Sequence, residues 1–179
     1  MWRNEIKSRF VTTFRIHVFQ NVENSIFVCL GNICRFPAAE NIMRHQVQQA
    51  GLSKEIICDS AGMIDKNIGK SPDPRMIDAA AARGIKLQGQ ARQFHQQDFE
   101  NYDLILAMDR DNYWSLISLD PYRKYREKIQ MMCDYSRRYW ETEVPDPYEG
   151  GQEGFNHVIN LLLDACEGLL DSIKYTEKN

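Results

Sequence analysis

Hydrophobic positions along this chain follow two alternating patterns, short continuous runs and runs with helical spacing. Continuous apolar runs predict four buried strands, at residues 26–29, 56–58, 102–108 and, more weakly, 128–132. Apolar residues three to four positions apart predict helices, at residues 39–50, 74–83, 113–117 and 155–173, with a shorter one within 85–101. Strands that alternate with helices predict an α/β domain in which helices cover both faces of a parallel sheet.

Residues with capping chemistry stand at the predicted helix ends. Asp73 before Pro74 has the form of an N-cap followed by proline at the first helical position, and Asp109 is placed to cap the helix that follows it. Gly51 and Gly84 end the first two helices. These residues therefore predict where the helices begin and end.

Composition narrows the class of protein. The chain has 179 residues, 43% of them hydrophobic, which suits one domain with one core. A net charge of −3 argues against a nucleic-acid partner, and no apolar run approaches the length of a membrane span. Five cysteines without a CxxC pair or a Cys/His metal spacing predict a reducing, cytoplasmic location with neither metal nor cofactor.

The first residues differ from the rest. Residues 1–25 hold four basic and two acidic side chains, and residues 14–18 alternate in a way compatible with a short strand. We therefore expect an N-terminal extension at 1–24 ahead of a domain at 25–179.

The stretch after the first strand carries the candidate chemistry. The strand ends at Cys29, a loop with Gly31 and Asn32 follows, and Arg35 comes shortly before Pro37, which is expected to begin a helix. Unpaired N–H groups at a helix start attract an anion, and an arginine fork binds two oxygens of a tetrahedral anion. Such a field also favours the thiolate form of a cysteine. The stretch thus predicts an oxyanion held over a thiol nucleophile.

This stretch, Cys29-Leu30-Gly31-Asn32-Ile33-Cys34-Arg35, resembles the phosphate loop of the low-molecular-weight protein tyrosine phosphatases, bacterial type. Further segments resemble the family in the family's order: Asp59-Ser60-Ala61-Gly62, residues 69–75, Ala91-Arg92-Gln93, Met108-Asp109 and Asp146-Pro147-Tyr148. The resemblance covers roughly residues 25 to 175. It implies a three-layer flavodoxin-like fold with a four-stranded parallel sheet, and hydrolysis of phosphotyrosine through a phosphocysteine intermediate.

The resemblance also implies residue roles. Cys29 would be the nucleophile and Asp146 the general acid, while Arg35 and the loop from Leu30 to Cys34 would hold the phosphate. Asn32 would maintain the loop through a bond to Ser60, and Asp109 would orient Arg35, although the N-cap role explains Asp109 almost as well. Lys66 and Tyr148 would form the substrate rim. The implied partner is a phosphotyrosine protein, with a bacterial tyrosine kinase as the candidate by analogy, and the expected oligomeric state is a monomer or weak dimer.

Three sites depart from the family pattern and leave alternatives open: Phe36, Gly89-Gln90, and Lys66 at a rim position that is often aromatic. Phe36 stands where the family has Ser or Thr, so a hydroxyl that can donate to the nucleophilic sulfur and cap the helix is missing. The loss of one hydrogen bond to a charged group costs roughly 1.5 to 3 kcal/mol, which predicts an attenuated phosphatase. Gly89-Gln90 replaces a histidine near the loop's supporting network, which weakens that network further.

A module that binds phosphotyrosine without turnover is the alternative function. An arsenate reductase would need two further cysteines close together, and Cys58, Cys133 and Cys166 are widely spaced. Cys34 is either a partner for a reversible disulfide with Cys29 or an inert loop cysteine.

Overall fold

The computed structural model describes residues 22–31 and 33–176. Four strands are present: β1 Asn24–Cys29, β2 Ile57–Gly62, β3 Leu104–Ala107 and β4 Ile129–Met131. The α-helices are α1 Arg35–Gln49, α2 Pro74–Ala81, α3 Asp98–Asn101, α4 Arg110–Leu119 and α5 Gln152–Thr176. Two short 3₁₀ turns, η1 Arg126–Lys128 and η2 Met132–Tyr135, flank β4. The predicted order of strands and helices is confirmed.

The strands form one parallel sheet in the order β2-β1-β3-β4. β1 is central, and its residues Ile26, Phe27 and Val28 are fully buried because the sheet is covered on both faces. In register, Ile26 lies beside Ile105 of β3. The carboxyl end of β1, where ligands bind in such sheets, therefore lies between two neighbouring strands.

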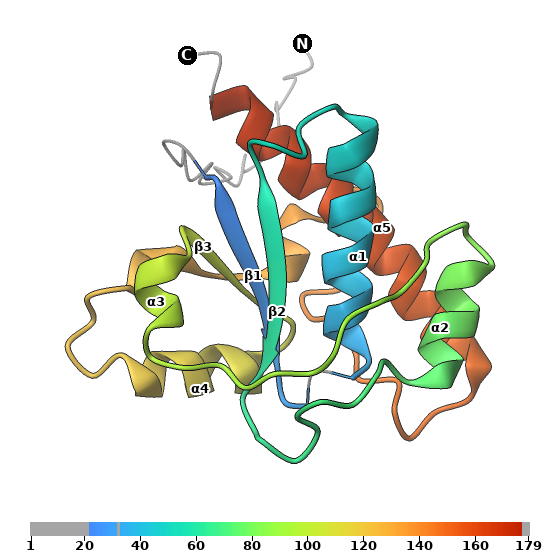
Figure 1. Ribbon diagram of the computed structural model, residues 1–179, viewed down its shortest axis with the longest axis horizontal. Coiled ribbons are helices and arrows are strands. Elements are labelled where there is room, and N and C mark those ends of the chain that lie inside the picture. Colours follow the sequence, from blue (N-terminus) through green and yellow to red (C-terminus); the bar gives the residue numbers. More distant parts are fainter. Residues whose placement is uncertain (1–21, 32, 177–179) are drawn as a thin grey trace, which may run out of the picture.

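Helices cover the two faces of this sheet (Figure 1). α1 and α5 lie against each other on one face, with α2 packed on α5, and α3 and α4 lie on the other. The apolar stripe of α5, which includes Val158, Leu162 and Leu169, is buried against this core. At Gly168 the helix approaches η2 so closely that a Cβ would overlap the carbonyl oxygen of Tyr135. The three-layer α/β architecture is as predicted.

The two predicted N-caps are present. The Asp73 carboxylate accepts a hydrogen bond from the Arg75 N–H at 2.9 Å, and Asp109 Oδ1 accepts from the Asn112 N–H at 2.7 Å. Each satisfies an amide that the helix leaves unpaired, as their sequence positions indicated.

Three element boundaries differ from the sequence prediction. β2 continues through the small residues to Gly62, because Gly62 pairs with Cys29 and its N–H donates to the Arg92 carbonyl at 2.8 Å. β3 is shorter than the apolar run, and Asp103 instead accepts from the Asn24 N–H with its side chain at 2.9 Å. α1 begins at Arg35, two residues before Pro37, so the prediction of a helix begun by the proline was wrong.

A partly buried polar cluster fixes β2 to the segment before β3. Asp59 accepts hydrogen bonds from the Tyr102 hydroxyl at 2.5 Å and from Arg92 Nη2 at 2.8 Å. Burial alone would raise the pKa of Asp59, but these hydrogen bonds lower it below its usual value. Arg92 also binds Asp98 at 2.9 Å, so one guanidinium joins two carboxylates.

Within the part of the chain that the structure describes, every helix is too short or too polar to cross a bilayer. The expected strand at 14–18, and all but the last residues of the expected extension at 1–24, lie outside the described residues. The domain division at residue 25 stays a prediction.

Candidate active site

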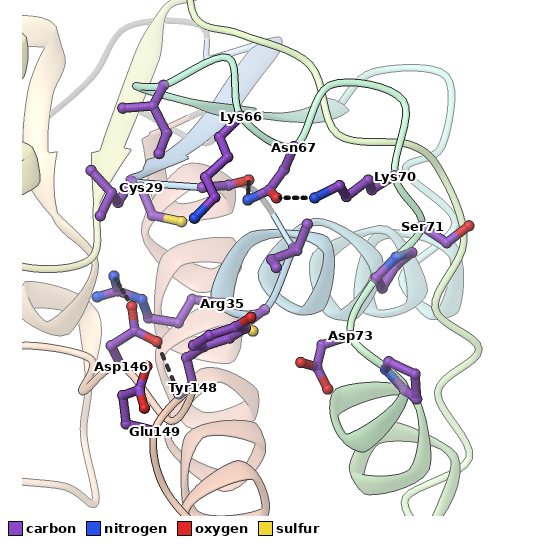
Figure 2. Close-up of a pocket in the computed structure, with 17 residues that line it drawn as sticks. Cys29, Arg35, Lys66, Asn67, Lys70, Ser71, Asp73, Asp146, Tyr148 and Glu149 are labelled. Carbon is purple, nitrogen blue, oxygen red and sulfur yellow. Dashed lines mark hydrogen bonds and ion pairs between the residues drawn. The ribbon is translucent and has the colours of Figure 1, made fainter.

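A pocket of about 630 Å³ opens at the carboxyl end of β1 (Figure 2). Its walls include most of the predicted site residues: Cys29, Leu30, Gly31, Ile33, Cys34, Arg35, Lys66, Asp146 and Tyr148. Three predicted supporting residues, Phe36, Ser60 and Asp109, do not line the pocket. Asn32 lies outside the described residues. The fold thus gathers residues from both ends of the chain around the Cys29 thiol.

Arg35 is the buried cation of this pocket. Its Nη1 donates to Asp109 Oδ2 at 2.5 Å and to the Val144 carbonyl at 3.1 Å, and Nη2 donates to Asp146 Oδ2 at 3.0 Å. Its Nε is buried and has no hydrogen-bond partner among the described residues. A buried N–H without a partner is costly, and an oxyanion is the partner that a guanidinium prefers.

Negative groups surround this guanidinium. Burial alone would lower the pKa of Arg35, but the charges of Cys29, Asp146 and Asp109 and the hydrogen bond to Asp109 raise it above its usual value. The positive charge is therefore fixed beside the thiol, where an incoming anion needs it.

Asp109 has both of the roles that the sequence left open. Its Oδ1 caps α4, while its Oδ2 binds Arg35. The cap holds the carboxylate in place, so the guanidinium is anchored to the start of a helix.

Cys34 differs from Cys29 in its surroundings. Burial raises the pKa of Cys34 to about 12, and the charges of Asp73, Asp146 and Cys29 act in the same direction. Cys34 therefore stays a thiol at neutral pH, which leaves Cys29 as the candidate nucleophile of the loop. The suggested disulfide between Cys29 and Cys34 stays a prediction.

The three remaining cysteines are buried thiols rather than the reactive pair that a disulfide relay needs. Burial raises the pKa of Cys58 and of Cys133 to about 12, and Cys166 is fully buried against α1. Buried thiols of this kind are inert, so the structure offers no support for the arsenate reductase alternative.

Phe36 occupies the second position of α1 and its side chain is fully buried. Cys34 holds the N-cap position, without a side-chain cap bond, so residue 36 is not the helix cap. The expected loss of a cap at Phe36 was therefore wrong, and only the loss of the hydroxyl donor remains as a consequence of the substitution. The ring is part of the core beneath the loop.

Ser60 lies behind the loop on β2. Its hydroxyl donates to the Glu40 carboxylate, which also binds Arg44 at 2.8 Å. Burial raises the pKa of Glu40 above its usual value, although the hydrogen bond from Ser60 and the charge of Arg44 act to lower it. The expected link from Ser60 to Asn32 cannot be followed, because Asn32 lies outside the described residues.

One segment, residues 63–73, binds the loop from outside, and we call it the bracing segment. Its backbone N–H groups donate to the carbonyl oxygens of Cys29, Leu30 and Ile33 at distances of 2.7, 3.0 and 2.8 Å. A side chain of the same segment, Asn67, donates from Nδ2 to the Gly31 carbonyl at 3.0 Å. The sequence analysis missed Asn67, because it stands in a polar loop without a motif.

The loop of the candidate acid is tied to α2. Arg75 Nη1 donates to the Tyr148 carbonyl at 3.0 Å, and its guanidinium lies 5.4 Å from the centre of the Tyr148 ring. Asp73 holds Arg75 at 2.8 Å, and Asp146 Oδ1 accepts from the Tyr148 N–H at 3.1 Å. Arg75 was also missed, although its block was recognised, because nothing local in the sequence places it near residue 148.

Lys66 and Tyr148 stand on opposite sides of the pocket mouth. In Figure 2 the Lys66 ammonium points toward the Cys29 sulfur, and the Tyr148 ring lies beyond Arg35. Both side chains reach the pocket, as expected for a substrate rim.

Comparisons with known proteins agree with this geometry. A family model described as low molecular weight phosphotyrosine protein phosphatase matches residues 24–179. A putative low molecular weight protein-tyrosine-phosphatase from Synechocystis is 56% identical over 148 residues, 83% of this chain and 94% of that protein. A crystal structure of a protein tyrosine phosphatase from Entamoeba histolytica has a TM-score of 0.84 at 42% identity and covers 87% of this chain and 99% of its own. The crystal structure of YfkJ from Bacillus subtilis has a TM-score of 0.81 at 38% identity, and the match covers 88% of this chain and 98% of YfkJ.

Proposed function

The chain belongs to the low molecular weight phosphotyrosine protein phosphatase family, and on that premise we propose that Cys29 is its nucleophile, Arg35 its phosphate-binding cation and Asp146 its general acid. The observation that carries this assignment is the buried Arg35 guanidinium, which is held by Asp109 and Asp146 beside the Cys29 thiol and keeps one N–H without a partner among the residues that the structure describes. No metal or cofactor has a role in this reaction.

The first half-reaction moves the phosphoryl group to sulfur. The Cys29 thiolate attacks phosphorus opposite the tyrosyl oxygen, so an S–P bond forms as the P–O bond breaks. The leaving phenolate has a pKa of about 10 and takes a proton from Asp146. Arg35 and the loop amides hold the equatorial oxygens, so that the charge is stabilised where it develops.

The second half-reaction returns the enzyme to its starting state. Asp146, now a carboxylate, takes a proton from water, whose oxygen attacks phosphorus as the S–P bond breaks. Inorganic phosphate leaves, the electron pair of the broken bond stays on the Cys29 sulfur, and Asp146 is protonated again. Both steps need a stable thiolate, first as nucleophile and then as leaving group.

The residue at position 36 bears on that thiolate. A hydroxyl in this position can donate to the sulfur, whereas the buried Phe36 ring cannot. We therefore propose that turnover is attenuated by about ten- to a hundredfold, the equivalent of one hydrogen bond to a charged group. The second candidate function is a module that binds phosphotyrosine without turnover, in which Phe36 disables the nucleophile while Arg35 and the loop amides still hold the anion.

The experiment compares the wild type with Cys29→Ser and Asp146→Asn on two aryl phosphates, phenyl phosphate and one with a more acidic phenol. We expect Cys29→Ser to abolish turnover. Asp146→Asn should slow phenyl phosphate by about 10²–10⁴-fold and the other ester less, because a more acidic phenol needs no proton. If the wild type does not exceed Cys29→Ser but still binds a phosphotyrosine peptide, the binding module is the correct function.

The substrate rim suggests a preference among phosphotyrosine proteins. Lys66 places a positive charge at the pocket mouth, which favours acidic residues around the phosphotyrosine. We expect Lys66→Trp to narrow the difference in kcat/KM between acidic and neutral phosphopeptides, and an unchanged ratio would refute this role. A bacterial tyrosine kinase is our candidate substrate, and the burial of all five cysteines as thiols supports a cytoplasmic location.

A further inference from the structure

The bracing segment determines which way the peptide groups of the phosphate loop face. It binds the carbonyl oxygens of Cys29, Leu30, Gly31 and Ile33 on one side of the loop. In a planar trans peptide the N–H points opposite to the C=O of the same unit. Holding these carbonyls on one side therefore turns the N–H groups of Leu30, Gly31 and Cys34, which follow three of them among the described residues, to the other side, which is how a loop forms an anion-binding concavity.

Three of these four bonds come from backbone N–H groups, and the fourth comes from the Asn67 side chain. Asn67 is 8% exposed, and its Nδ2 donates to the Gly31 carbonyl at 3.0 Å. Its Oδ1 accepts from Lys70 Nζ at 2.9 Å. Because an ammonium group can only donate, Lys70 fixes Oδ1 on its own side and so turns Nδ2 toward the loop.

The packing around Gly31 supports this link independently. A Cβ at Gly31 would lie 2.8 Å from Asn67 Nδ2, so the amide rests directly on the loop backbone. Figure 2 shows the Asn67 side chain between the loop and Lys70, away from the thiol. Asn67 therefore lines the pocket and also contacts the phosphate loop at Gly31.

We propose that Asn67, oriented by Lys70, is a positioning residue that holds the Gly31 peptide in the phosphate-binding conformation. This inference rests on the proposed function, because it takes the loop as the phosphate site. Without the amide, the Gly31 carbonyl loses its partner and the loop samples conformations that do not bind the anion.

The test is Asn67→Leu, which keeps the size of the side chain and adds no charge but cannot donate. We expect the Kd for inorganic phosphate, measured by calorimetry, to rise about tenfold. The kcat/KM should fall by a similar factor for both aryl phosphates, since the proton donor is not disturbed. Asn101→Leu makes the same asparagine-to-leucine substitution at an exposed position of α3. This control should leave the phosphate Kd and kcat/KM unchanged.

Introducing Lys70→Met into the wild type and into Asn67→Leu distinguishes two roles of Lys70, the orientation of the Asn67 amide and the direct attraction of the anion. Loss of a positive charge weakens phosphate binding in any background, but loss of orientation matters only while Asn67 is present. We expect Lys70→Met to weaken phosphate binding more in the wild type than in Asn67→Leu. Equal effects in both backgrounds, or an unchanged Kd in Asn67→Leu, would overturn the proposal.

These results are distinguishable from a failure of the proposed function. A wild type no more active than Cys29→Ser would refute the catalytic assignment, whereas the phosphate Kd of Asn67→Leu decides the role of Asn67 without turnover. A melting temperature of Asn67→Leu equal to that of Asn101→Leu shows that the effect is local. A decrease in melting temperature without a change in Kd assigns Asn67 a purely structural role and refutes the inference.

Discussion

Replacing Phe36 with serine should have opposite effects on stability and on catalysis. The ring is fully buried at the second position of α1, so its removal leaves a cavity in the core. The new hydroxyl, in contrast, is expected to supply a hydrogen-bond donor to the sulfur of Cys29, the proposed nucleophile. Phe36→Ser is therefore expected to be a less stable but faster enzyme.

The two magnitudes can be estimated separately. Truncation of a buried phenylalanine costs about 3–5 kcal/mol of unfolding free energy. At roughly 2–4 °C per kcal/mol for a chain of this size, the melting temperature should fall by about 6–20 °C. One hydrogen bond to the thiolate contributes about 1.5–3 kcal/mol, so kcat should rise about ten- to a hundredfold.

The assay is turnover of an aryl phosphate per folded molecule, at a temperature where circular dichroism shows every variant folded. Phe36→Ala makes the same cavity without a hydroxyl, and Phe99→Ser adds a hydroxyl to an equally buried site in α3. Both controls should lose stability without any gain in rate. A gain in Phe36→Ala equal to that in Phe36→Ser, or no gain in either, would refute the hydroxyl as the cause of attenuation.

Three further predictions follow from individual contacts. Asp109→Asn keeps an N-cap for α4 but turns an amide donor toward the buried Arg35, so kcat/KM should fall about tenfold or more and the melting temperature should fall as well. Gly168→Ala should lower the melting temperature by roughly 6 °C or more in calorimetry, because its Cβ overlaps a backbone carbonyl, whereas Gly154→Ala in the same helix has room and should not. The lowered pKa of Asp59 means that its carboxylate stabilises the fold above about pH 4 and that this contribution is lost on further acidification. Thermal melts of Asp59→Asn should therefore differ from the wild type at pH 7 and converge with it at lower pH.

Local sequence predicted those features whose cause is local. Asp73 and Asp109 cap helices because a short carboxylate reaches the next free amides, and the continuous apolar run of β1 needs no partner to be recognised. Cys29 and Arg35 could be paired because one short loop carries both. The start of α1 was misplaced, because the rule that proline occupies the first helical position did not hold for Pro37.

Contacts between distant segments could not be predicted in this way. Asn67 reaches Gly31 across a separation of 36 residues, and Arg75 reaches Tyr148 across 73. Gly168 gives no local signal either, since its lack of a side chain serves a close approach to Tyr135 rather than a turn. Such contacts depend on the packing of the whole sheet and its helices, which no local pattern encodes.

We also expect anion binding to be separable from the chemistry at sulfur. The loop carbonyls are held by the bracing segment and Arg35 is held by Asp109, and none of these contacts involves the side chain of residue 36. Phe36 should therefore leave phosphate binding intact while it slows the steps that depend on the thiolate. Phe36→Ser is then expected to raise kcat with an unchanged phosphate Kd, whereas Asn67→Leu raises the Kd. If Phe36→Ser instead tightens phosphate binding as much as it raises kcat, position 36 shapes the loop itself, and the two functions are not separate.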